Sequence, residues 1–300
     1  MYKHVLVPLD GSELAETALP YAGEIAGRLG SKVTIIYVSE PEKPDPFPRM
    51  HRSYMDRMVA ATQREAAKYL DKKAGTTQAT SEILKGNAAE KIVDYADAKD
   101  AGLIVMTTHG RTGVKRWALG SVAEKVVRAS VKPVFLIRGT GPRPARSKKG
   151  AFLKALVPLD GSKAGESALP QMAELAAKLN TELILLQVLP LGFMDMSPSG
   201  YGWVMYREEA VRATELLAKE YLDEVGARLM NRGVTAVRSE VRFGDAAQTI
   251  IEFADEAKVN VVAMSTHGSS GIRRWVFGNV ADRVLHEGKT PVLLVKAAEG

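Results

Sequence analysis

Residues 5–38 read "VLVPLDGSELAETALPYAGEIAGRLGSKVTIIYV", and residues 155–188 repeat the pattern without a gap as "ALVPLDGSKAGESALPQMAELAAKLNTELILLQV". Each copy starts with a continuously apolar run, continues with apolar residues at helical spacing and ends with a second apolar run. Continuously apolar strands are typical of a parallel sheet that is covered on both faces. The stretch therefore predicts strand–helix–strand units joined by right-handed crossovers.

The duplication continues along the chain. "GNAAEKIVDYADA" (86–98) matches "GDAAQTIIEFADE" (244–256), and "KPVFLIR" (132–138) matches "TPVLLVK" (290–296). The offset grows from 150 to 158 residues, so the second repeat gains 158 − 150 = 8 residues after Val188. Repetition at this scale indicates two copies of one domain.

A stretch rich in Gly, Pro and basic residues, "GTGPRPARSKKGAF" (139–152), has the composition of an exposed linker. We expect a first domain at 1–140, a linker at 141–152 and a second domain at 153–300. In the first repeat, strands are expected at roughly 4–9, 32–39, 79–84, 102–107 and 133–138, with helices at roughly 13–29, 51–75, 87–99 and 120–130. The predicted class is α/β, with two repeated, doubly wound, mainly parallel five-stranded sheets flanked by helices.

Composition excludes several classes of protein. The 300 residues carry 41 − 35 = +6 charges, but much of the excess lies in "RPARSKKG" (143–150), and the 6% of aromatic residues do not interleave with the basic ones. This pattern argues against a nucleic-acid binder. The absence of cysteine excludes disulfides, thiolate nucleophiles and cysteine-ligated zinc. No signal peptide and no apolar run of about 18 residues are present, so we expect a cytoplasmic protein without a membrane span.

Glycine-punctuated loops follow the fourth predicted strand of each repeat: "TTHGRTGVKRWALGS" (107–121) and "STHGSSGIRRWVFGN" (265–279). Glycines allow backbone amides to approach an anion, and a helix that begins after the loop favours a phosphate at its N-terminus. The alternative is a turn whose last residue caps a helix. The residues that would form this phosphate side are Gly110, Gly113, Gly120 and Ser121, and Gly268, Gly271, Gly278 and Asn279.

Two further features fall at the carboxyl ends of the strands, where open α/β sheets bind ligands. Asp10 and Asp160 end the first strand of their repeats and are candidate acceptors for ribose hydroxyls, or alternatively form an N-cap or Asx turn in "DGS". His109 and His267 lack the clustered partners of a metal or catalytic site, so we expect them to stabilise the loop or lie near a phosphate. Trp117 and Trp275 are expected to anchor the loops.

These residues together resemble the universal stress protein family in its tandem form, over nearly the whole chain. The family motif Gly-x2-Gly-x9-Gly-(Ser/Thr) maps onto Thr107-x2-Gly110-x9-Gly120-Ser121 and onto Ser265-x2-Gly268-x9-Gly278-Asn279. "VPLDGS", "THG" and the "KPV" or "TPV" before the last strand are also similar. The chain departs from the motif at Thr107 and Ser265, which replace its first glycine, and at Asn279.

The resemblance implies a Rossmann-like fold similar to the adenine nucleotide α-hydrolases and an ATP-binding, stress-response function, with ADP or AMP as alternative ligands and Mg²⁺ or Mn²⁺ as the accompanying ion. Asp10 and Asp160 would lie near the ribose, and Val38 and Val188 would contact adenine through backbone groups. Residues 133–138 would pair antiparallel with 291–296, and other surfaces would form a homodimer. The remaining residues implied for the nucleotide site are Pro8, Leu9, Met106 and Val122, and Pro158, Leu159, Met264 and Val280.

The repeats diverge after the second strand, at 40–58 and 189–208. These segments are expected to be lids or partner surfaces, or else locally packed loops; the second carries Phe193, Met194, Met196, Tyr201 and Trp203. No "HxGH" or "SGGxDS" signature and no general base with an orienting partner is evident, so no catalytic residue is assigned. The leading hypothesis is a nucleotide-binding regulator; the alternatives are a ligand-free interaction module and a weak ATPase.

Overall fold

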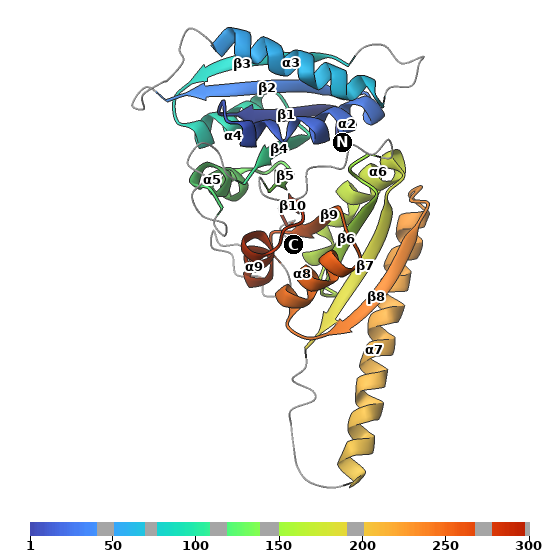
Figure 1. Cartoon of the computed structure of the whole chain (residues 1–300). Coiled ribbons are helices and arrows are strands. Elements are labelled where there is room, and N and C mark those ends of the chain that lie inside the picture. The colour runs from blue at the N-terminus through green and yellow to red at the C-terminus, as the bar shows by residue number, and fades with distance from the viewer. Residues whose placement is uncertain are drawn as a thin grey trace. The chain divides into compact units, whose positions relative to one another are not determined.

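The structure is a computed structural model that describes residues 1–40, 51–69, 77–108, 119–138, 150–190, 201–267 and 278–297, with the backbone alone described at 201–207. The chain divides into two compact units. The first comprises Met1–Leu153 and Lys289–Lys296, and the second comprises Lys154–Gly288 and Ala297–Gly300. Figure 1 shows both units as sheets flanked by helices.

In the first unit the strands lie in the order β3-β2-β1-β4-β5, and each neighbouring pair is parallel. The strands are β1 (His4–Leu9), β2 (Lys32–Ser39), β3 (Ala79–Lys85), β4 (Leu103–Thr107) and β5 (Val134–Ile137). The helices are α1 (Glu13–Glu16), α2 (Leu19–Leu29), α3 (His51–Ala67), α4 (Ala88–Ala98) and α5 (Ser121–Ala129). The order reverses at β1, from which β2 and β4 depart to opposite sides, so the doubly wound class is confirmed.

The second unit repeats this arrangement with parallel strands in the order β9-β6-β7-β8. The strands are β6 (Lys154–Leu159), β7 (Glu182–Leu189), β8 (Val237–Phe243) and β9 (Val261–Ser265). The helical segments are η1 (Gly165–Ala168), α6 (Leu169–Leu179), α7 (Tyr201–Met230), α8 (Ala246–Glu256) and α9 (Asn279–Glu287). Within the described ranges no helix is long and apolar enough to span a membrane.

The last strand of the sequence, β10 (Val292–Val295), pairs antiparallel with β5, with Leu293 opposite Phe135. This is the pairing within one chain that the family resemblance implies. It places the final strand of the second repeat in the first compact unit.

The helix predicted at 13–29 is wrong as a single element, because α1 ends at Glu16 and α2 begins at Leu19. Pro20 lies in the first turn of α2; its nitrogen cannot donate to the preceding turn, and its ring disfavours a continuous helix. Pro170 has the same effect between η1 and α6. The helix expected at 51–75 ends at Ala67.

The residues that precede β6 pack within the first unit. The Ala151 amide donates to Glu24 Oε2 at 2.6 Å, and Glu24 itself is 1% exposed. The Phe152 ring lies 5.9 Å from Tyr21 and 5.5 Å from Phe135, measured between ring centroids. A buried carboxylate and an aromatic cluster therefore hold the chain where it enters β6.

Candidate nucleotide site

The register of the strands brings the predicted site residues to one edge in each unit. Leu9 pairs with Tyr37 and Leu6 pairs with Ile104, so Asp10, Val38 and the end of β4 lie at the same edge of the sheet. In the second unit, Leu159 pairs with Gln187 and Leu156 pairs with Val262, which places Asp160, Val188 and the end of β9 in the same way. These are the carboxyl ends of the parallel strands, where α/β sheets bind ligands.

The strand-one aspartate of the first unit is held in an Asx turn. Asp10 Oδ1 accepts hydrogen bonds from the Ser12 amide at 3.0 Å and the Ser12 hydroxyl at 2.6 Å. The N-cap of α1 is Ser12, whose Oγ accepts from the Ala15 amide at 3.1 Å. The turn interpretation of "DGS" is therefore right and the N-cap interpretation of Asp10 is wrong, since the serine serves as the cap.

Asp160 lies in the same turn in the second unit. Its Oδ1 accepts from the Ser162 amide at 3.0 Å and the Ser162 hydroxyl at 2.6 Å, and Ser162 Oγ accepts from the Gly165 amide at 2.9 Å. The turns thus give Asp10 and Asp160 matching orientations at the edges of their sheets.

A backbone hydrogen bond joins the described residues on either side of each glycine loop. The Gly120 amide donates to the Thr108 carbonyl at 2.7 Å, and the Gly278 amide donates to the Thr266 carbonyl at 2.9 Å. The helix after each loop consequently begins beside the end of the preceding strand. The predicted residues that lie outside the described part of the chain are His109, Gly110, Gly113, Gly268 and Gly271, together with Trp117 and Trp275.

Helices α5 and α9 begin at Ser121 and Asn279, and the cap positions are the glycines Gly120 and Gly278. Neither glycine offers a side-chain acceptor to the amides of the first turn. The interpretation of Ser121 and Asn279 as helix caps is therefore wrong: both are the first helical residue, and both are exposed. Amides at a helix N-terminus, together with the helix dipole, favour an anion.

The caps of the preceding helices differ. Asn87 Oδ1 accepts from the Ala89 and Glu90 amides at 3.1 and 3.3 Å at the start of α4, and Asp245 Oδ1 accepts from the Gln248 amide at 2.9 Å at the start of α8. Among α4, α5, α8 and α9, glycine therefore occupies the cap position only in α5 and α9, the two helices that follow the glycine loops. This contrast agrees with a phosphate position at α5 and α9.

Thr107 and Ser265, which stand where the family motif has its first glycine, are each 7% exposed. The Ser265 hydroxyl donates to the His267 carbonyl at the start of the loop. His267 Nδ1 lies 3.0 Å from the Thr266 hydroxyl oxygen, an arrangement that supports the expected loop-stabilising role. The extra side chains of Thr107 and Ser265 are therefore accommodated inside the fold.

The remaining predicted residues lie at or next to the carboxyl ends of the strands, or at the start of α5 and α9. Met106 and Met264 are each 6% exposed and belong to the core. Leu9 and Leu159 are buried, whereas the other predicted side chains are half-buried: Pro8, Val38, Val122, Pro158, Val188 and Val280.

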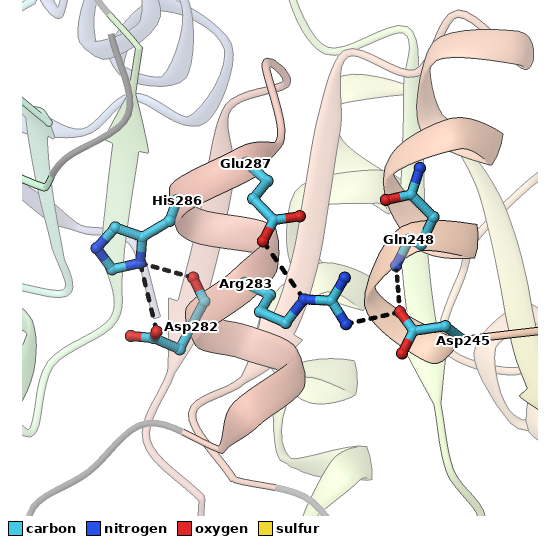
Figure 2. A network of polar contacts seen from close by, with 6 residues as sticks. All are labelled: Asp245, Gln248, Asp282, Arg283, His286 and Glu287. Atoms are coloured by element: carbon cyan, nitrogen blue, oxygen red, sulfur yellow. Dashed lines mark hydrogen bonds and ion pairs between the residues drawn. The ribbon is translucent and has the colours of Figure 1, made fainter. Parts of the chain in front are cut away.

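A polar network fastens α9 to the start of α8 (Figure 2). Arg283 Nη1 lies 2.8 Å from Asp245 Oδ1, and Arg283 Nε lies 3.4 Å from Glu287 Oε1. The hydrogen bond to the Gln248 amide, followed by the contact with Arg283, lowers the pKa of Asp245. One acidic side chain thus caps α8 and orients α9. Among the described residues, no cluster of three His, Cys, Asp or Glu side chains that could hold a metal ion is present.

Sequence reasoning missed a glutamate and a tyrosine beside the aspartate of each unit. Glu16 and Glu166 occupy equivalent positions in "DGSELAE" and "DGSKAGE", so the Asp-x5-Glu spacing is a signal that points to them. The tyrosines, Tyr54 of α3 and Tyr221 of α7, differ in their position in the repeat and leave no such signal.

The divergent segments overlap helices. α3 begins at His51, where the helix at 51–75 was expected to begin, and α7 begins at Tyr201, so the last residues of each segment, 51–58 and 201–208, belong to a helix. Residues 41–50 and 191–200, which include Phe193, Met194 and Met196, lie outside the described part of the chain, as do the side chains of Tyr201 and Trp203.

The profile of the universal stress protein family matches residues 1–138 and 151–296. A universal stress protein of Methanocaldococcus jannaschii, MJ0531, is 33% identical over 144 residues, which cover 46% of this chain and 83% of that protein. One from Mycolicibacterium smegmatis is 25% identical over 301 residues, covering 97% of this chain and 96% of its own length. A universal stress protein structure from Archaeoglobus fulgidus shares the fold over 99% of this chain and 100% of its own, with a TM-score of 0.66 and 19% identity.

Proposed function

Since the chain belongs to the universal stress protein family, we propose that it is a regulatory, stress-response protein that binds ATP at the carboxyl edge of the parallel sheet, in one or both units. The family membership supplies the class of protein. The ligand is inferred from the arrangement of this chain's own residues. ADP and AMP present the same adenine and ribose and are the alternative ligands.

One observation carries the proposal. In both units the cap glycine of a helix donates a backbone hydrogen bond to the end of a strand, from Gly120 to Thr108 and from Gly278 to Thr266. This bond brings a helix N-terminus that has no side-chain cap to the sheet edge where the aspartate after the first strand of the unit lies. A helix N-terminus suits the phosphates, and a carboxylate suits the ribose hydroxyls. The two groups together fit a nucleotide better than either a free phosphate or a free sugar.

The proposed role is binding rather than catalysis. In the described residues around the edge, Asp10 and Asp160 are engaged in turns, and His267 contacts its neighbour Thr266. Neither arrangement is that of a base positioned to activate water. We therefore expect the bound nucleotide to act as a signal, with at most slow hydrolysis, and with Mg²⁺ or Mn²⁺ neutralising the phosphates.

The test is the amount of ATP bound per chain, measured by isothermal titration calorimetry in the presence of Mg²⁺, of Mn²⁺ and of EDTA. Gly120→Val and Gly278→Val each place a branched side chain at a helix cap, so each is expected to remove one binding event. Gly226→Ala is the control, because a Cβ at Gly226 would meet its nearest neighbour at an ordinary 3.4 Å.

The alternatives give different results. A ligand-free interaction module binds no ATP at millimolar concentration, which would refute the proposal. Turnover of about 1 s⁻¹ or faster would instead identify an enzyme. Unchanged binding by both valine variants would contradict the placement of the phosphates. A homodimer stays a prediction, which sedimentation equilibrium checks.

A further inference from the structure

The turn that follows Asp160 is held from the side by α7. Glu166 Oε1, in η1, accepts a hydrogen bond from the Tyr221 hydroxyl at 3.0 Å and another from Arg228 Nη2 at 2.8 Å. Tyr221 and Arg228 are seven residues apart, about two helical turns, and so lie on the same face of α7. Figure 1 shows α7 as the long helix alongside β8 in the second unit. Two donors of one helix thus hold a single carboxylate.

The same turn lies directly against the Asp160 carboxylate. A Cβ built on Gly165 would lie 2.4 Å from Asp160 Oδ1, so at this position a glycine lets the backbone approach the acid. The Ser162 hydroxyl connects the two, since it donates to Asp160 at 2.6 Å and accepts from the Gly165 amide at 2.9 Å. The Glu166 amide in turn donates to the Ser162 carbonyl at 3.1 Å. A continuous set of contacts therefore runs from α7 through Glu166 to Asp160.

The charge states suit a contact that persists at neutral pH. Burial, followed by the hydrogen bond to Glu166, raises the pKa of the Tyr221 phenol, which therefore stays protonated and donates. Burial also acts to raise the pKa of Glu166, but the hydrogen bonds from Arg228 and Tyr221 outweigh it and lower that pKa. Glu166 is consequently ionised, and charge-assisted hydrogen bonds are the stronger kind.

The first unit differs at this place. The Tyr54 hydroxyl of α3 is buried and has no hydrogen-bond partner among the described residues, and burial, followed by the nearby Glu16 carboxylate, raises its pKa. Glu16 is the counterpart of Glu166, but Tyr54 has no equivalent place in the repeat to Tyr221. Among the described residues, the hydrogen bond from a tyrosine to this glutamate is thus found in the second unit, to which the inference is confined.

We propose that Tyr221 and Arg228 are positioning residues which, through Glu166, hold the turn that orients Asp160 and so determine how well the second unit recognises the ribose of its nucleotide. This inference rests on the proposed nucleotide function. Because coupling between two sites is reciprocal, a nucleotide bound through its ribose also stabilises the contact between α7 and the turn.

The experiment compares ATP with 2′,3′-dideoxy-ATP, which lacks both ribose hydroxyls. Binding is measured in the full-length chain with Gly120→Val as the background, so that the second unit is observed alone. We expect Tyr221→Phe and Glu166→Gln each to reduce the ratio of the two affinities by about fivefold or more. A general loss of stability would weaken the binding of both nucleotides equally and leave the ratio of their affinities unchanged. That result would overturn the proposal.

Tyr95→Phe is the matched control. It removes a hydrogen bond of the same kind, from the Tyr95 hydroxyl to Glu82 Oε1 at 2.6 Å, in the first unit. We expect it to leave the ratio of affinities unchanged. Thermal unfolding followed by circular dichroism checks that each variant is folded.

Hydrogen exchange of the Ser162 and Gly165 amides, without nucleotide, separates this inference from the proposed function. Tyr221→Phe is expected to accelerate exchange at these two amides severalfold, because local opening controls their protection. Unchanged exchange would overturn the positioning role whether or not ATP binds. Absence of ATP binding by the parent chain, with faster exchange in the variant, would refute ribose recognition and the nucleotide function while leaving the contact between α7 and the turn intact.

Discussion

Replacing Gly150 by alanine tests how the segment before β6 is held within the first unit. Gly150 has a φ of +93°, and a Cβ there would lie 2.0 Å from Glu24 Oε1 and 2.9 Å from Arg28 Nη2. The left-handed backbone conformation costs an alanine about 1–2 kcal/mol. Displacing Glu24 also breaks its 2.6 Å hydrogen bond from the Ala151 amide and leaves a buried carboxylate without that donor, at about 1–3 kcal/mol.

The expected loss in the free energy of unfolding for Gly150→Ala is therefore roughly 2–5 kcal/mol, the sum of these two costs. Gly30→Ala is the matched control, because Gly30 has a φ of +68° and nothing within 4 Å of its Cβ position. Its expected loss is the backbone cost alone, about 1–2 kcal/mol. The difference between the two variants isolates the overlap with Glu24.

The assay is urea unfolding of the full chain followed by circular dichroism, with the midpoint and slope fitted for each variant. Because two compact units need not unfold together, each transition is fitted separately if two are resolved. Equal losses for Gly150→Ala and Gly30→Ala would refute the reasoning. They would mean that the segment at Gly150 is not held tightly against Glu24.

Two further outcomes follow from charged side chains. Burial raises the pKa of Glu24 despite its contacts with the Ala151 amide and Arg28. The stability that Glu24 contributes is therefore fully present below its pKa in the unfolded chain and is lost as pH rises through its pKa in the folded protein. Glu24→Gln should therefore flatten the dependence of the unfolding free energy on pH above about 4.5, measured by urea titrations at successive pH values; an unaltered slope would contradict this. Asp245→Ala should lower the melting temperature through loss of the α8 cap, worth about 1 kcal/mol, whereas Asp245→Asn keeps the cap acceptor and should lose less. Equal melting temperatures for both Asp245 variants would show that the ion pair with Arg283 outweighs the cap.

Local sequence patterns predicted most of the strands and the turn at the site. The apolar runs at 4–9 and 32–39 form β1 and β2 with those bounds, because a buried parallel strand needs continuous apolar side chains. "DGS" forms the expected Asx turn, which depends on residues two positions apart. The continuous helix at 13–29 was wrong because the apolar periodicity outweighed Pro20 in that prediction.

The cap residues show a limit of the same reasoning. Ser121 and Asn279 are good capping residues by type, yet the glycines before them occupy the cap position. Residue type alone does not fix where a helix begins, since the backbone bonds from Gly120 to Thr108 and from Gly278 to Thr266 determine it. The pattern therefore located the candidate phosphate edge but not the first residue of the helix there.

The sequence by itself determined the duplication, the family and the edge of the sheet that carries the candidate site, because these follow from repetition, periodicity and turn chemistry along the chain. Only the tertiary structure determined what holds that edge in place. Tyr221 donates a hydrogen bond to Glu166, 55 residues away in the sequence, and the Ala151 amide donates one to Glu24, 127 residues away. No periodic pattern in the sequence indicates such pairs, since they form only when the packing of the chain brings distant polar groups together and removes water from around them.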